Sequence, residues 1–176
     1  MNPTESVVVT HTVHRLSVLL GLPFDDAVRR YERLVPVADM ARFAQLPTWD
    51  AAIEQAELNA PLGFMRYWKL DVTSLLAGAG PGWKCVEYLM GNHTIAEQMY
   101  RHDPTALLHA PLRTMIHADR DGATFFTIDQ PSTLFSNFDN ADIAATGRHL
   151  DALVVGLLDA MDAPVPAELR LVGAAS

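Results

Sequence analysis

The chain has 176 residues, of which 49% are hydrophobic and 19% charged, and its formal net charge is −8. This length suits one domain with its own core, so we expect a single domain over residues 1–176, with a core over 7–163 and loose tails at 1–6 and 164–176. The negative charge, without a Lys/Arg run, argues against nucleic acid as a partner. No apolar run reaches the roughly 18 to 20 residues of a membrane span, so we expect no span and, by default, a cytoplasmic location.

A strand and three helical segments are expected first. Residues 7–20 are rich in Val, Thr and Leu and end at a Gly-Leu-Pro turn, which is typical of a strand. An early proline, two acidic residues in the first turn and apolar residues at helical spacing predict a helix over 23–35. Two more helical stretches follow over 37–45 and 48–58, the second with Thr48 as its N-cap.

The middle of the chain predicts paired strands. Residues 62–72 and 83–90 are rich in aromatic side chains, and the Gly- and Pro-rich stretch 78–82 between them is typical of a turn. Residues 92–101 predict a short helix. Strands over 112–119 and 123–128 then flank Asp-Gly, a dipeptide that tolerates the positive φ of a tight hairpin turn. A two-residue turn would set His117 opposite Phe126 and Met115 opposite Ile128.

Residues 142–161 close the chain as a helix with one apolar stripe, which needs a sheet to pack against. The order of these elements predicts an α+β fold: an antiparallel twisted sheet of about five strands, with the long C-terminal helix and a helical insert packed on it.

The segment from Gly91 to Pro131 resembles the family catalogued as domain of unknown function 302. The residues that carry this resemblance are Gly91-Asn92-His93, Ala110-Pro111-Leu112, Asp121-Gly122 and Ile128-Asp129-Gln130-Pro131, together with Pro23 to Val28 in the first helix. The family implies a sheet-and-helix fold similar to that of the TATA-box-binding protein, a homodimer, and no established activity. Two departures stand out: Asn92-His93 replaces the family's Asn-Pro, and the helical insert over 37–58 is long.

Three residues are candidates for acid–base chemistry. His117 shares one face of the hairpin with Arg113 and Met115. From there it could act as a general base or haem ligand, or have only a structural role at the sheet edge. His93 opens a helix at the position of the family's proline. Asp129 ends a strand and also suits a turn. The histidine spacing matches no metal motif, so we expect no metal site.

Aromatic and thioether side chains are concentrated in the predicted sheet, and an apolar pocket between the sheet and the C-terminal helix is one use for them. The candidate pocket residues are Phe64, Tyr67, Trp68, Arg113, Met115 and Phe126.

Three hypotheses about function follow. The first is a homodimer that binds a small apolar molecule in that pocket. The second is an enzyme that acts on a small apolar substrate or haem, with a histidine as acid, base or ligand. The third is an accessory subunit that docks a protein partner on the sheet edge or on the insert over 37–58. The sequence identifies no particular cofactor.

Overall fold

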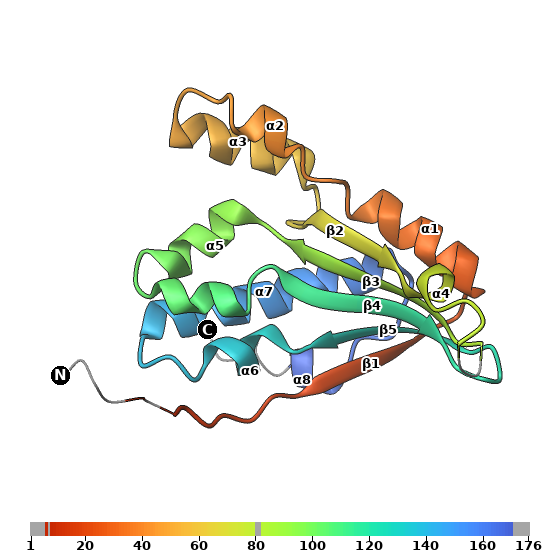
Figure 1. Cartoon of the computed structure of the whole chain (residues 1–176). Helices are drawn as coiled ribbons and strands as arrows, with labels where there is room; N and C mark the ends of the chain where they lie inside the picture. Colours follow the sequence, from red (N-terminus) through yellow and green to blue (C-terminus); the bar gives the residue numbers. More distant parts are fainter. Residues whose placement is uncertain (1–5, 7, 80–81, 171–176) are drawn as a thin grey trace.

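A five-stranded antiparallel sheet forms one layer of the fold (Figure 1). The computed structural model describes residue 6, residues 8–79 and residues 82–170. In chain order the strands are β1 (Arg15–Leu20), β2 (Met65–Asp71), β3 (Lys84–Gly91), β4 (Leu112–Ala118) and β5 (Thr124–Asp129). Across the sheet their order is β1-β5-β4-β3-β2, so the first two strands of the chain form its two edges.

Two helices, α1 (Phe24–Leu34) and α7 (Ala141–Ala160), cover one face of this sheet. In Figure 1, α7 passes behind the strands. Side chains alternate in burial along β1 and β4, because successive residues point to opposite faces. The core lies between the two layers, where Tyr31 of α1, Ile116 of β4 and Phe126 of β5 are fully buried. From α7 the core receives Ile143, Leu150, Val154, Leu157 and Leu158.

Neither α1 nor α7 covers the opposite face, which we call the open face. Leu19 and Trp68 on this face are 51% and 42% exposed. By strand register it comprises Arg15, Ser17 and Leu19 of β1, Trp68 and Leu70 of β2, Cys85, Glu87 and Leu89 of β3, Arg113, Met115 and His117 of β4, and Phe125, Thr127 and Asp129 of β5.

The remaining helices are short. They are α2 (Met40–Phe43), α3 (Trp49–Asn59), α4 (Val72–Leu75), α5 (His93–Tyr100), the 3-10 helix η1 (Pro104–Leu108), α6 (Pro131–Phe135) and α8 (Ala167–Arg170). Helices α2 and α3 form the insert, which projects beyond β2 in Figure 1. A small separate core holds the insert to the sheet, and its buried members are Ala38, Ala56, Ala60 and Met65.

The predicted α+β class, the five antiparallel strands and the long C-terminal helix are confirmed. Three of the expected elements have other bounds in the structure. The first strand begins only at Arg15. The helix expected over 37–45 is limited to Met40–Phe43, because the backbone of residues 36–38 instead bonds to Arg66 of β2. The strand expected over 62–72 ends at Asp71, whose carboxylate accepts a hydrogen bond from the Ser74 N–H at 3.1 Å and so starts α4.

The β4–β5 turn is one residue longer than predicted. Asp119 and Ala123 pair at its base, and Gly122 takes a φ of +84°, as a three-residue hairpin turn requires. The added residue shifts the register by one, so His117 lies opposite Phe125 rather than Phe126, and Met115 opposite Thr127 rather than Ile128.

The tail expected to be loose is ordered in part. Residues Ala167–Arg170 form α8, and Leu169 is 3% exposed within the core. The expected tail at 1–6 and residues 171–176 lie outside the described residues, except for residue 6. None of the helices that the structure describes is both long and apolar enough to span a bilayer.

Candidate functional site

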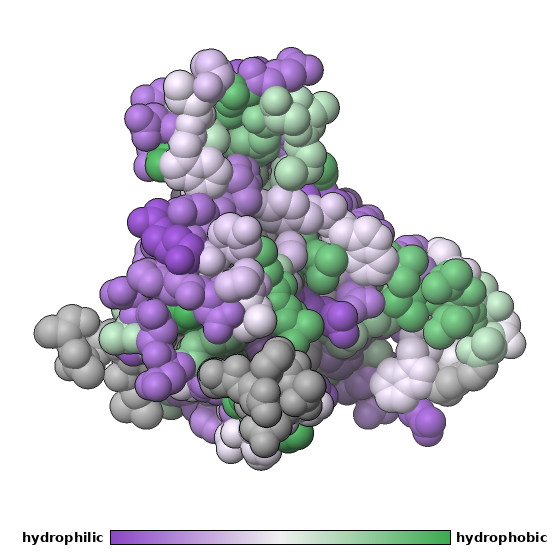
Figure 2. Space-filling model, turned by 60° about the vertical axis from the view of Figure 1, so that its left-hand side comes forward, coloured by the Kyte–Doolittle hydropathy of each residue, from purple (hydrophilic) through white to green (hydrophobic). Residues whose placement is uncertain are grey.

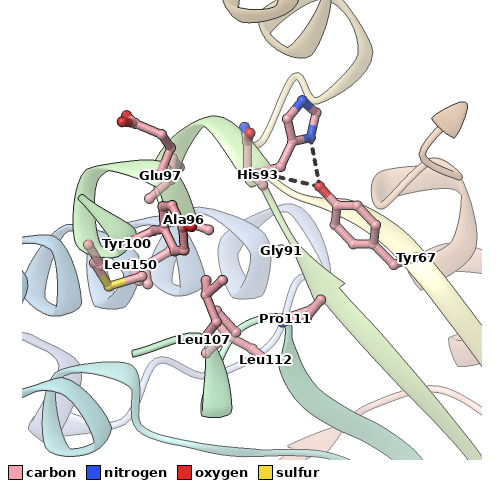
Figure 3. A pocket seen from close by; sticks show the side chains of 14 residues that line it. Tyr67, Gly91, His93, Ala96, Glu97, Tyr100, Leu107, Pro111, Leu112 and Leu150 are labelled. Atoms are coloured by element: carbon pink, nitrogen blue, oxygen red, sulfur yellow. Dashed lines mark hydrogen bonds between the residues drawn. The ribbon is translucent and has the colours of Figure 1, made fainter. Parts of the chain in front are cut away.

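An apolar pocket opens where β3 ends and β4 begins (Figure 3). Helix α5 forms one wall, η1 and Pro111 form another, and Leu150 of α7 also contributes. The pocket encloses about 310 Å³. Its hydrophobic lining is made by Ile95, Ala96, Met99, Leu107, Ala110, Pro111, Leu112 and Leu150.

Asn92 fixes the start of α5 beside the pocket. Its side-chain oxygen accepts hydrogen bonds from the Thr94 N–H at 3.0 Å and from the Thr94 hydroxyl at 2.8 Å. Its amide nitrogen donates to the Gly63 carbonyl at 3.2 Å. The N-cap therefore also ties α5 to the loop before β2.

Tyr67 and His93 meet at the pocket rim. The backbone N–H of His93 donates to the Tyr67 hydroxyl oxygen at 2.9 Å, and the same oxygen lies 2.9 Å from Nδ1 of the His93 ring. No other acceptor for this hydroxyl is found within the described ranges. We therefore assign Tyr67 as the donor to Nδ1, which leaves the His93 ring neutral with its proton on Nε2.

Burial favours the neutral forms of both His93 and Tyr67. It lowers the pKa of His93, because a charged ring would lose hydration there. It raises the pKa of Tyr67, although the hydrogen bond from the His93 backbone opposes this shift. At neutral pH the rim therefore carries an uncharged phenol and an uncharged imidazole.

The His93 ring also connects the pocket rim to the insert. It packs edge-on against Phe43 of α2, with ring centroids 4.3 Å apart, and lies 6.2 Å from the ring of Trp49 in α3. In Figure 3 the imidazole points away from Leu107 and Leu112 on the other side of the pocket. The polar edge of His93 thus belongs to the junction with the insert rather than to the pocket interior.

The structure brings some of the predicted site residues together in two pairs, one at the pocket rim and one, Arg113 with Asp129, in a second cleft. Tyr67 and His93 share the rim. Phe64 and Phe126 are fully buried in the core and do not line the pocket. Two more of the candidate pocket residues, Trp68 and Met115, lie on the open face.

His117 lies on the open face, well apart in the sheet from the pocket. Its ring stacks on Phe125 with centroids 5.4 Å apart, and its Nε2 lies 3.1 Å from the Thr127 hydroxyl, which in turn lies 3.0 Å from the Ser17 hydroxyl. The nearby carboxylate expected beside a catalytic histidine is found at neither His117 nor His93 within the described part of the chain.

Arg113 and Asp129 line a second, more polar cleft of about 370 Å³, together with His109. Each charge is already neutralised. Arg113 pairs with Glu87 at 3.1 Å, and Asp129 pairs with Arg15 at 3.3 Å. The two cavities share four lining residues, Leu107, Ala110, Pro111 and Leu112.

Sequence reasoning missed most of the pocket wall, including Met99, Leu107 and Leu150. Their spacing is that of ordinary core residues, and nothing in it marks a cavity. The available signal was the segment from Gly91 to Leu112, which carries half of the family resemblance and also forms most of the wall.

The insert presents a separate apolar surface, green at the top of Figure 2. Its exposed side chains are Val37, Met40, Trp49 and Leu58. Docking of a protein partner there stays a prediction.

The fold and this site define a two-layer α+β protein with an apolar pocket at one end of its sheet. The chain belongs to the family described as domain of unknown function DUF302, whose sequence profile matches residues 48–161.

One solved structure extends the likeness beyond that segment. It is the crystal structure of the uncharacterized conserved protein DUF302 from Bacillus stearothermophilus, which is 14% identical and superposes with a TM-score of 0.61. The match covers 84% of this chain and 97% of that chain. At this identity the likeness shows the fold alone. No curated protein sequence matches the chain.

Proposed function

We propose that this protein binds a small apolar molecule in the pocket between α5, η1 and the end of the sheet. The observation that carries the proposal is the pocket itself: about 310 Å³ of space walled almost entirely by hydrophobic side chains. Ligand pockets in proteins are commonly roughly 300 to 1,000 Å³ and mostly apolar, with a few polar groups at fixed positions. Tyr67 and His93 supply such groups at the rim.

The pocket is not where the sequence placed it. Between the sheet and α7, Ile116, Phe126 and Leu157 are fully buried. The free space instead lies at the strand ends, where the chain leaves β3 for α5 and returns through η1 to β4. We place the ligand at this end.

Ala96→Leu tests the proposal. Ala96 lines the pocket from α5, so a leucine there occupies the ligand's space and keeps a good helix former. We expect the fluorescence of the neutral probe N-phenyl-1-naphthylamine to rise on addition of the wild-type protein and to stay near its free value with Ala96→Leu. The matched control is Ala152→Leu on the exposed side of α7, which should bind like wild type. Equal binding by all three proteins would contradict the proposal.

Binding is better supported than catalysis. A histidine acting as acid or base is usually oriented by a hydrogen-bonded carboxylate. Within the described residues, the histidine that lies near a carboxylate is His102, 3.5 Å from Asp142, and it does not line the apolar pocket. The enzyme hypothesis therefore has no site as well formed as the pocket.

We also propose that two copies associate through the open face. The chain as a whole carries a net charge of −8, but the strands place two arginines and two carboxylates on this face, in the pairs Arg15–Asp129 and Arg113–Glu87. A face whose charges cancel can meet its own copy without the repulsion that the rest of the surface would impose. The same face also carries the apolar side chains of Leu89, Met115 and Phe125.

A further inference from the structure

We infer that the ligand of the pocket is an uncharged, hydrocarbon-like molecule of about two fused rings, and that carboxylates and other anions are excluded. This inference rests on the proposed function, since it names the chemical class that the same pocket takes. It follows from which polar groups at the pocket are already engaged, from the charge at its wall, and from its size.

The start of α5 cannot hold an anion. Free N–H groups at a helix N-terminus often bind carboxylate or phosphate. Here the N–H of His93 donates to Tyr67 and that of Thr94 to Asn92 Oδ1, while the N–H groups of Ile95 and Ala96 both donate to the Asn92 carbonyl. All four donors of the first turn are therefore used before a ligand arrives.

Most polar side chains at the wall are engaged as well. Tyr67 uses its single proton on Nδ1 of His93, and Asn92 uses its oxygen and one of its two amide N–H groups. The His93 Nε2 edge is on the side of the insert. Tyr100 is 52% exposed, so water can hydrate it. An ionised ligand would exchange its own hydration for mostly apolar contacts, with the second Asn92 N–H and the Tyr100 hydroxyl as the donors left.

The only ionised group on the described wall is an acid. Glu97 lines the pocket and pairs with Arg101, which does not line it. An anionic ligand would thus meet no cationic side chain on the described wall, and the net charge of −8 adds a repulsion.

Volume limits the hydrocarbon. An apolar cavity of roughly 150 Å³ in another protein accommodates benzene. A pocket of about 310 Å³ is twice that size, which suits two fused aromatic rings or a branched hydrocarbon of similar volume. The same volume is small for a large macrocycle such as haem.

A methionine reporter inside the pocket makes the test specific. Met99 lines the pocket and is 1% exposed, and Met99→Leu would identify its resonance among the seven methionines in a spectrum of methyl-¹³C-methionine protein. The probes are naphthalene and 2-naphthoate, which share their rings and differ by one negative charge. An aromatic ring placed beside the Met99 methyl shifts its resonance.

We expect naphthalene to shift the Met99 resonance saturably, and 2-naphthoate to bind at least about tenfold more weakly, which corresponds to about 1.4 kcal/mol. Equal or tighter binding of 2-naphthoate at this resonance would overturn the neutral class while leaving the proposed function standing. Failure of both probes to shift it would overturn both proposals. Ala96→Leu serves as the blocked control, in which neither probe should move the resonance.

Discussion

Tyr67 shows why residue positions were harder to predict than elements. Its strand contains a bulge between Arg66 and Trp68, which breaks the strict alternation of side chains that strand reasoning assumes. The bulge lets Tyr67 reach His93, 26 positions later in the chain. The sequence selected both residues as candidates, but a period of two could not predict that they would meet.

The neutral state of His93 predicts an acid-sensitive stability. Because burial lowers the folded-state pKa of His93 below its ordinary value of 6.5, the unfolded chain binds the proton more readily. The stabilisation is complete above pH 6.5 and is lost as the pH falls through the folded-state pKa. We expect His93→Asn, which offers Tyr67 an acceptor that does not titrate, to lose less thermal stability than wild type between about pH 7.5 and about pH 5.

Thermal unfolding followed by circular dichroism at each pH provides the measurement. Other groups, including His109, whose pKa is lowered by burial and by His11, contribute equally to both proteins and cancel in the difference. Parallel curves for wild type and His93→Asn would show that His93 is as easily protonated in the folded protein as in the unfolded chain.

At the level of elements, the hairpin was predicted in place but not in register. The alternation that puts Arg113, Met115 and His117 on one face holds, since it depends only on the strand itself. Their cross-strand partners depend on turn length, and Asp-Gly is compatible with both two-residue and three-residue turns. The longer turn brings Phe125 to the open face, where it stacks on His117.

The cap of α5 predicts a graded loss of stability. Asn92→Ala removes both the cap acceptor and the donor to the Gly63 carbonyl, whereas Asn92→Asp keeps the acceptor and loses the donor. We expect Asn92→Ala to lower the free energy of unfolding by about 1 to 2 kcal/mol and Asn92→Asp by less, as measured by urea denaturation. An equal loss in both variants would mean that the tie to Gly63, and not the cap, carries the effect.

At the level of the whole molecule, composition and element order sufficed for the fold class but not for the position of the cavity. The apolar stripe of residues 142–161 predicts that the helix packs on a sheet, and α7 does. A stripe contains no information on how closely the side chains fit. The side chains between α7 and the sheet are buried, and the apolar pocket lies where η1 and α5 meet the strand ends.

The open face predicts the oligomeric state. In dilute solution we expect wild type to be a dimer by light scattering, and Met115→Asp to be a monomer, because it places an added carboxylate opposite Glu87 on the central strand of that face. Leu58→Asp, at an 81% exposed position on the insert, is the matched control and should stay dimeric. A monomeric wild type, or a folded Met115→Asp dimer, would contradict association through this face.

The strand order has a consequence for how the protein is made. β1 is the first strand to leave the ribosome, and its partner in the sheet is β5, the last; Arg15 pairs with Asp129, 114 positions later. The hydroxyl of Tyr31 in α1 likewise forms its hydrogen bond with Thr114 of β4, 83 positions later. The segment that contains β1 and α1 therefore stays without these native neighbours until they have been synthesised, and assembly of the sheet is completed only once the chain has been made as far as Asp129.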